Sequence, residues 1–173
     1  MKKLAFLAAV TLLAQPPDPR IVAQYYPTPE IVVDKMLQMS ALKPGEKMYD
    51  LGSGDGRIVI MAARKYKANA EGVELDDSLV KQSAERIKKL GLEATAKIIA
   101  GDLLEQDYSS ADVVTIYLLP VAVERMTPIL EKQLKKGARV VAHDFQFSKW
   151  VPAQHVQMKD SEGRDHELFL YRR

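Results

Sequence analysis

The 173-residue sequence contains no cysteine, which excludes disulfide bonds, thiolate metal sites and a cysteine nucleophile. It also lacks a strong excess of charge of either sign. The formal net charge is only +2, which argues against a strongly basic surface for nucleic acid. The sequence shows no internal repeat and no low-complexity tract. A chain of this length forms one domain and can bury a sizeable core.

A long hydrophobic run is missing as well, because the apolar run at residues 4–14 is too short for a normal transmembrane helix. Two lysines precede this run and a proline-rich break follows it, as in a secretory signal peptide, although Leu12 fits poorly with cleavage after Ala14. We expect residues 1–20 to be a signal-like or anchoring leader and residues 21–173 to be a single domain. Export, an uncleaved membrane-surface anchor and an unprocessed leader all stay open.

The dinucleotide-binding pattern G-x-G-x-x-G is absent, because Arg57 stands where its last glycine would be. The stretch 48–60 has an apolar run ending in Asp50, then glycines at alternate positions in 52–56, then an apolar helical pattern. This predicts a buried strand, a tight turn and a helix N-terminus, which suit an adenosine-containing ligand. The pattern acid-x-G-x-G-x-G resembles class I S-adenosylmethionine (SAM)-dependent methyltransferases, whose donor carries an ammonium and a sulfonium but no phosphate.

A second acid, Glu74, ends the short predicted strand at residues 68–74, about 20 residues beyond the glycines. This is the spacing at which a carboxylate reaches ribose hydroxyls in a βαβ unit. We therefore predict that Glu74 binds the ribose; the alternative is a solvated strand end. Asp77 or Ser78 could cap the helix that follows.

Strands alternate with helices along the chain and a hairpin closes it, which predicts an α/β fold with a Rossmann-like, doubly wound, seven-stranded sheet. The sheet should be mostly parallel, with an antiparallel strand in the C-terminal hairpin. Expected helices cover residues 57–66, 77–90 and 121–134, after a first helix for which Thr28 is the expected N-cap. Expected strands cover residues 48–51, 68–74, 96–102, 112–120, 138–143, 151–159 and 166–171.

Two later strand ends carry further candidates. In this fold Asp102 would face the adenine edge and accept from its exocyclic amine, with Leu103 lying under the ring, although Asp102 could instead cap a short turn. The end of the next strand would face the methyl group. Tyr117-Leu118-Leu119-Pro120 stands there, and an apolar slot with one phenol suits an aliphatic amine better than a planar amide.

The segment before the first helix, Tyr25-Tyr26-Pro27-Thr28-Pro29, is stiffened by two prolines and could act as a lid over the site. Alternatively, the tyrosines only pack on the core. The sequence resembles one family in five places: Tyr25-x-Pro27-Thr28-Pro29, the stretch 49–58, Gly72-Val73-Glu74-Leu75, the strand end Leu118-Leu119, and residues 137–141 with His143, Phe145 and Trp150. It is the small protein-lysine methyltransferases that include the archaeal broad-specificity enzyme and the mitochondrial ATP synthase c-subunit lysine methyltransferase. The resemblance covers about residues 22–171.

The resemblance implies SAM as cofactor, S-adenosylhomocysteine as product, and no metal. The implied cofactor-binding residues are Thr28, Asp50, Gly52, Ser53, Gly54, Asp55, Gly56, Glu74, Leu75, Asp102, Leu103 and Tyr117. Aromatic faces can hold a lysine ammonium by cation–π contact, and the candidates for that wall are Tyr25, Tyr117, Phe145 and Trp150. His143 and Asp144 are candidate proton acceptors. The alternatives are a structural role for His143 and a core position for Trp150.

The expected activity is methyl transfer from SAM to lysine side chains of a protein, with no nucleic-acid partner. The leader would allow association with a membrane, whereas dependence on SAM favours access to the cytoplasm, so the compartment stays open. A methyltransferase for a small molecule or RNA and a non-catalytic SAM-binding protein are the alternatives, and a nicotinamide oxidoreductase fits least because of Arg57.

Overall fold

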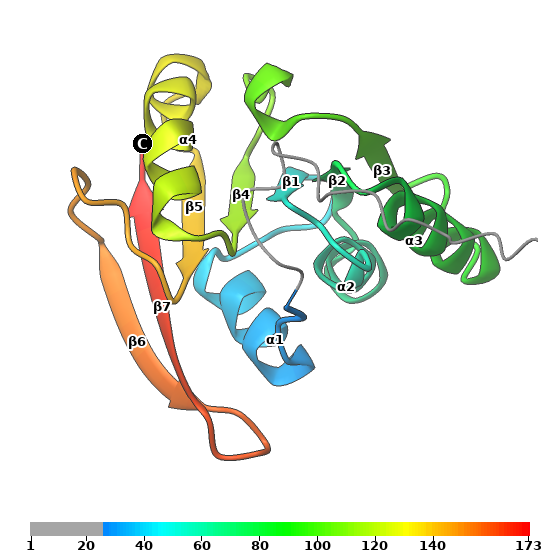
Figure 1. The fold of residues 1–173 in the computed structure, drawn as a ribbon, viewed down its shortest axis with the longest axis horizontal. Helices are drawn as coiled ribbons and strands as arrows, with labels where there is room; N and C mark the ends of the chain where they lie inside the picture. The colour runs from blue at the N-terminus through cyan, green and yellow to red at the C-terminus, as the bar shows by residue number, and fades with distance from the viewer. Residues whose placement is uncertain (1–25) are drawn as a thin grey trace, which may run out of the picture.

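The computed structural model describes residues 26–173, which form one seven-stranded sheet with helices on both faces (Figure 1). The strand order is β3-β2-β1-β4-β5-β7-β6. Strands β1 to β5 pair in parallel, whereas β7 lies antiparallel between β5 and β6. The predicted fold class, a doubly wound and mostly parallel sheet with an antiparallel C-terminal hairpin, is confirmed.

The strands are β1 (Lys47–Leu51), β2 (Asn69–Glu74), β3 (Ala96–Ala100), β4 (Val113–Ile116), β5 (Arg139–His143), β6 (Gln154–Lys159) and β7 (Asp165–Arg172). The helices are α1 (Glu30–Met39), α2 (Arg57–Tyr66), α3 (Asp77–Lys89) and α4 (Pro120–Gln133), with a 3-10 turn, η1 (Leu103–Glu105).

The central strands are buried because helices cover both faces of the sheet, as expected for parallel strands. On one face, apolar residues of α1 and α2 and Ile87 of α3 pack against the sheet. On the other face, α4 packs with Tyr108 and with aromatic residues that follow β5. Two separate cores therefore hold the sheet between them.

The strand order reverses between β1 and β4. Strands β2 and β3 lie on one side of β1, whereas β4 and β5 lie on its other side. A crevice at the carboxyl ends of the strands is the usual ligand site at such a switch point. Asp50 and Glu74 lie at the carboxyl ends of β1 and β2, and Asp102 follows β3.

Two helix starts differ from the sequence predictions. Helix α1 begins after Pro29 without a side-chain cap, and the Thr28 hydroxyl contacts His143 instead, so the predicted Thr28 cap is wrong. Helix α3 is capped by Asp76, which accepts from the backbone N–H groups of Ser78 and Leu79, rather than by Asp77 or Ser78 itself.

Strand β4 ends at Ile116, earlier than predicted, because Leu119 adopts the N-cap position and Pro120 begins α4. Tyr117 and Leu118 therefore lie in the connection between β4 and α4. They face the same edge of the sheet as the glycine stretch.

The predicted leader at residues 1–20 and Tyr25 lie outside the described residues. Within residues 26–173, none of the helices combines the length and the hydropathy needed to cross a bilayer.

Candidate active site

A cavity of about 550 Å³ opens at the carboxyl ends of β1, β2 and β4. Its volume is in the range of small-molecule and cofactor sites. The lining residues come from the segment before α1, the glycine stretch, the strand ends, the loop after β3 and the start of α4. They include Tyr26, Thr28, Asp50, Gly52, Ser53, Gly54, Asp55, Arg57, Glu74, Leu75, Asp76, Asp102, Leu103, Tyr117, Arg125 and Phe145.

The glycine stretch is held against the neighbouring strand by close backbone contact. The N–H groups of Gly52 and Ser53 both donate to the carbonyl of Val73, at 3.0 and 2.9 Å. Gly72 lies directly under Ser53, and a Cβ atom on Gly72 would be only 2.5 Å from the Ser53 side chain. Gly56, the N-cap of α2, has a φ of 75°, which favours glycine. These contacts fix the floor of the cavity.

The Glu74 carboxylate holds the loop that surrounds it. One oxygen accepts from the N–H of Gly54 at 2.7 Å, and the other accepts from the N–H groups of Leu75 and Asp76, each at 2.9 Å. A carboxylate has about four acceptor positions, so acceptor capacity remains toward the cavity. Among the residues that the structure describes, backbone groups rather than a cationic side chain position Glu74.

Asp50 is 2% exposed and accepts a hydrogen bond from the Thr115 hydroxyl at 2.7 Å. Burial raises its pKa to about 7; the Thr115 hydrogen bond opposes this shift, and the negative charges of Glu74 and Asp55 add to it. Because the neighbouring charges that act on Asp50 are negative, a cationic group in the cavity would stabilise its carboxylate.

Asp55 lines the cavity, but its carboxylate is already paired. Arg57 donates to both oxygens, at 2.9 and 2.8 Å, and Arg86 lies 3.2 Å away. Burial would raise the pKa of Asp55, but the hydrogen bonds and charge of Arg57 outweigh burial and lower the pKa. Arg57 also donates to the Thr28 carbonyl at 2.9 Å, which joins the glycine stretch to the segment before α1.

The loop after β3 forms another wall of the cavity. Asp102 and Leu103 both line it, as the sequence predicts. One oxygen of Asp102 accepts from the Leu104 N–H at 2.9 Å and caps the 3-10 turn η1. The cap alternative is therefore confirmed. The second carboxylate oxygen keeps Asp102 a candidate hydrogen-bond acceptor for a ligand.

At the β4 side, Tyr117 and Phe145 present two nearly parallel rings to the cavity, with centroids 6.4 Å apart and an interplanar angle of 15°. Tyr117 also packs against the His143 ring, at a centroid distance of 3.9 Å. Burial, followed by the charge of Asp144 and a hydrogen bond to it, raises the pKa of Tyr117 to about 12. The phenol is therefore neutral near pH 7.

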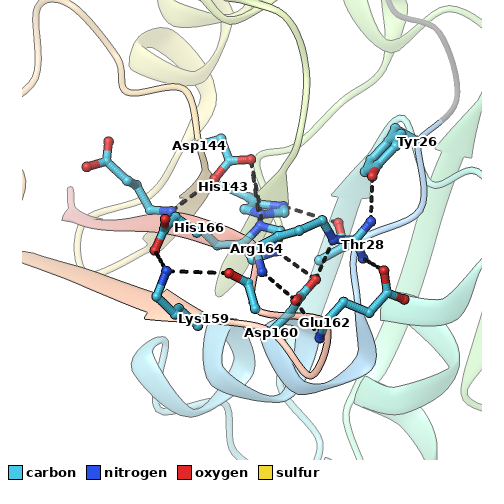
Figure 2. A network of polar contacts seen from close by, with 12 residues as sticks. Tyr26, Thr28, His143, Asp144, Lys159, Asp160, Glu162, Arg164 and His166 are labelled. Atoms are coloured by element: carbon cyan, nitrogen blue, oxygen red, sulfur yellow. Dashed lines mark hydrogen bonds and ion pairs between the residues drawn. The ribbon is translucent and has the colours of Figure 1, made fainter.

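His143 and Asp144 do not line the cavity, although the His143 ring packs against Tyr117, which does. Figure 2 shows His143, Asp144 and His166 close together. Burial lowers the pKa of His143 to about 4; the charge of Asp144 opposes this shift and His166 adds to it. His143 contacts the Thr28 hydroxyl through Nδ1 at 3.2 Å and His166 through Nε2 at 2.9 Å. The sequence analysis missed His166, which comes from the hairpin strand β7.

Trp150 does not form a wall of the cavity, so that prediction is wrong in its placement. Its ring stacks on Phe147 at 4.2 Å and packs edge-on against Tyr171, while its indole N–H donates to Glu131 at 2.8 Å. Trp150 thus belongs to the core under α4. Gly56 is also absent from the lining, because it sits at the start of α2. Tyr26, beside the candidate Tyr25, does line the cavity.

Within residues 26–173, His143, Asp144 and His166 form the one group whose potential metal ligands lie within 4.8 Å of one another. The facing ring nitrogens of His143 and His166 are satisfied by a hydrogen bond to each other, because one donates and the other accepts. The group is explained as a hydrogen-bonded network, and none of its contacts calls for a metal ion.

Comparison with known proteins gives consistent results. Residues 50–154 match the family described as the ANTKMT methyltransferase domain. A protein-lysine N-methyltransferase of Saccharolobus islandicus is 40% identical over 148 residues, which cover 85% of this chain and 91% of that protein. The human ATP synthase c-subunit lysine N-methyltransferase is 32% identical over 86% of this chain, which corresponds to 63% of the human protein.

Among solved structures, an RNA methyltransferase from Salinibacter ruber in complex with S-adenosylhomocysteine is 43% identical and superposes with a TM-score of 0.79. The match covers 85% of this chain and 93% of that chain. The resemblance seen in the sequence is confirmed by these matches. The chain therefore belongs to the ANTKMT methyltransferase domain family and is a SAM-dependent methyltransferase.

Proposed function

We propose that this enzyme methylates the ε-amine of lysine side chains in proteins. The proposal rests mainly on the aromatic end of the cavity, which the rings of Tyr117 and Phe145 line. Asp144, His143 and His166 lie next to these rings, outside the cavity lining. Aromatic faces attract an alkyl ammonium, and the carboxylate behind them favours a positive charge. The names of the sequence relatives in Saccharolobus islandicus and human support the same substrate class.

The cavity residues fit a bound SAM. Asp50, at the end of β1, is a buried acid, and a neighbouring cation would stabilise its ionised form. The amino group and the sulfonium of SAM are both cationic. Glu74 is oriented by three backbone N–H groups and would hold the ribose. Asp102 and Leu103 would hold the adenine. These residue roles are part of the proposal.

Bound SAM supplies an electrophilic methyl group on a sulfonium. The chain itself must position the acceptor amine, exclude water and keep the amine neutral, since a free lysine titrates near 10.4. Holding two reactants in the correct orientation can supply roughly 7–11 kcal/mol of the barrier. We propose that the rings of Tyr117 and Phe145 provide this positioning and desolvation.

RNA is the second candidate substrate, because the structural relative from Salinibacter ruber is named an RNA methyltransferase. The formal net charge of the chain is only +2, which argues against a polyanionic substrate. The cavity lining is acidic and suits the cationic SAM. Its acids are Asp50, Asp55, Glu74, Asp76 and Asp102, and its bases are Arg57 and Arg125. Arg57 is already paired with Asp55, so the lining favours cationic ligands.

The test uses SAM with an isotopically labelled methyl group and offers core histones, as lysine-rich proteins, in parallel with total RNA. Mass spectrometry of digested protein should show methylated lysine, and RNA should carry no label above background. Asp50→Ala serves as a control with weakened SAM binding, and Glu93→Ala, on the exposed surface, as its matched active control. Label on RNA alone, or on small molecules alone, would contradict the proposal.

Membrane association through residues 1–20 stays a prediction, because these residues lie outside the described part of the chain. Fractionation of the native protein tests it. N-terminal sequencing would show whether the leader is removed.

A further inference from the structure

A continuous line of hydrogen bonds runs from the cavity wall into the C-terminal hairpin (Figure 2). The Thr28 hydroxyl lies 3.2 Å from Nδ1 of His143, whose Nε2 lies 2.9 Å from Nδ1 of His166. Nε2 of His166 lies 3.3 Å from a carboxylate oxygen of Asp160. Thr28 is part of the cavity lining, the two histidines and Asp160 are not, and all four residues are buried. Buried imidazoles in series can pass a proton along their shared bonds.

The direction of each hydrogen bond along this line follows from Asp160, the residue at its end. Burial would raise the pKa of Asp160, but hydrogen bonds from Arg164 and His166 hold it well below its usual range, so Asp160 accepts. Nε2 of His166 must then carry a proton, and in a neutral ring its Nδ1 accepts. His143 consequently donates from Nε2, and its free Nδ1 accepts from the Thr28 hydroxyl. Every bond is satisfied with both rings neutral.

Charged and titratable groups from four elements face the two rings. Tyr117, after β4, stacks on His143. Asp144, after β5, places an oxygen 3.4 Å from His143 Nε2 and 3.8 Å from His166 Nδ1. From the hairpin, Asp160 contacts His166 and is paired with Arg164 at 2.7 Å. Arg164 in turn donates to the hydroxyl of Tyr26, in the segment before α1, at 2.7 Å.

His166 lies between two carboxylates. Its Nδ1 is 3.8 Å from an oxygen of Asp144 and its Nε2 is 3.3 Å from an oxygen of Asp160, so a proton passed to this ring has a carboxylate on either side. Asp144 holds its place through its backbone, since its N–H donates to the Glu167 carbonyl at 2.7 Å and its side chain accepts from the Glu167 N–H at 3.0 Å. Its φ of 59° is unusual for a residue with a side chain, and such strain is frequent at functional sites.

We propose that Thr28, His143 and His166 form a proton relay that accepts the proton that the substrate amine must lose before methylation. The inference rests on the proposed lysine specificity, because an RNA base or a neutral acceptor would not require this step. His143 and His166 act as relay residues behind the cavity wall, and Thr28 is the member that reaches the cavity.

The transfer conserves atoms and charge. An N–H bond of the lysine ammonium breaks as an O–H bond forms on Thr28, whose original hydroxyl proton moves to Nδ1 of His143. The proton on Nε2 of His143 then moves to Nδ1 of His166. The products are a neutral amine, a neutral His143 and a His166 imidazolium beside Asp144 and Asp160. The proton on Nδ1 of His166 then leaves to water past Asp144, whose carboxylate lies 3.8 Å away and whose side chain is 26% exposed.

The test compares pH profiles of kcat, with saturating SAM and core histones, for Thr28→Val and His166→Asn. Thr28→Val keeps the shape of the side chain but removes the hydroxyl. In both variants the amine must lose its proton to bulk water. The acid limb of the kcat profile should therefore shift to higher pH, toward the lysine pKa near 10.4. We expect a loss of at least about tenfold at pH 7.5 and recovery at high pH.

Matched variants separate this role from a structural one. Thr28→Ser keeps the hydroxyl and should restore the wild-type profile. His155→Asn replaces a histidine on β6 that lies outside the relay, at 41% side-chain exposure, and should leave the profile unshifted. An equal loss at every pH, or no loss at any pH, would overturn the relay. A wild-type protein that labels no lysine at any pH would instead refute the proposed function.

A second readout does not depend on activity. In ligand-free protein labelled with 15N at histidine, ring-nitrogen chemical shifts should show His143 neutral with its proton on Nε2, and His166 with a proton on Nε2. Thr28→Val should perturb Nδ1 of His143 without unfolding the protein. The opposite tautomer of His143, or a His143 that is charged at pH 7, would refute the relay.

Discussion

The backbone N–H of Gly54 donates to the Glu74 carboxylate at 2.7 Å, which joins the glycine stretch to the end of the neighbouring strand. The other oxygen of Glu74 accepts from the next two backbone groups along the chain, Leu75 and Asp76. One side chain therefore orders both the loop and the strand end, so the wall of the cavity is formed before any ligand enters. Such preorganisation reduces the entropy lost on binding.

Glu74→Gln should weaken SAM binding by about 1–3 kcal/mol, because the amide N–H₂ group cannot accept from a backbone N–H or from a ribose hydroxyl. Isothermal titration calorimetry gives the dissociation constant. Glu85→Gln, on the exposed face of α3, is the matched control and should bind as the wild type does. Equal affinities of the two variants would refute the role of Glu74.

Asp50→Asn should stabilise the ligand-free protein at alkaline pH. The pKa of Asp50 in the folded protein, about 7, lies above its ordinary value of 3.8, mainly because of burial. The stabilisation that this protonated acid provides is therefore complete below about pH 4 and is lost as the pH rises through 7. At pH 8 the variant should gain at least about 1 kcal/mol in free energy of unfolding, measured with urea. At pH 4 the two proteins should differ little.

The affinity of the wild type for SAM should fall as the pH drops from about 8 to 6, because binding of the cation requires the ionised form of Asp50. Calorimetry near pH 7 in buffers of different ionisation enthalpy should detect proton release on binding. Asp50→Asn should bind weakly with little pH dependence over this range. An unchanged pH dependence in the variant would assign the titration to another group.

Gly72→Ala should destabilise the fold by about 1–3 kcal/mol, because the new methyl group would overlap the Ser53 side chain, 2.5 Å away. The backbone of Gly72 lies outside the left-handed region, so the cost is one of space rather than of conformation. The double variant Gly72→Ala/Ser53→Gly should recover part of the loss in urea unfolding. Additive effects in this cycle would contradict the steric explanation.

Trp150→Phe should lower the free energy of unfolding by about 1–3 kcal/mol and leave the KM for the protein substrate unchanged. The variant loses the hydrogen bond to Glu131 and weakens the cation–π contact with Arg173, both outside the cavity. Phe145→Leu, which removes a ring that lines the cavity, should raise KM instead. A raised KM in Trp150→Phe would restore the predicted place of Trp150 at the substrate site.

The glycine stretch and the acids at the strand ends could be predicted because their geometry is local. In a parallel sheet the carboxyl ends of the strands meet at one edge, so a motif on each strand is enough to bring Asp50, Glu74 and Asp102 to one cavity. Tyr117 and Phe145 follow the same rule, since each comes just after a strand of that sheet.

Contacts between distant segments could not be predicted in this way. Thr28 and His143 are 115 residues apart, and nothing near Thr28 distinguishes a hydroxyl that caps a helix from one that contacts an imidazole. His166 and Trp150 depend on the course of the last strands, and β7 brings His166 behind the site and Tyr171 against Trp150. The aromatic residues after β5 could face either the cavity or the core beside α4, and the sequence does not show how each of them packs.

The position of β7 between β5 and β6 also constrains how the chain folds. During synthesis β6 leaves the ribosome before β7, and among the described strands β7 is the one with which β6 pairs. The five parallel strands can assemble earlier, whereas Leu168 and Leu170 of β7 complete the core beneath α1 only afterwards. This sheet should therefore be completed only when β7 inserts between β5 and β6, and until then the nascent protein exposes an unpaired sheet edge to chaperones.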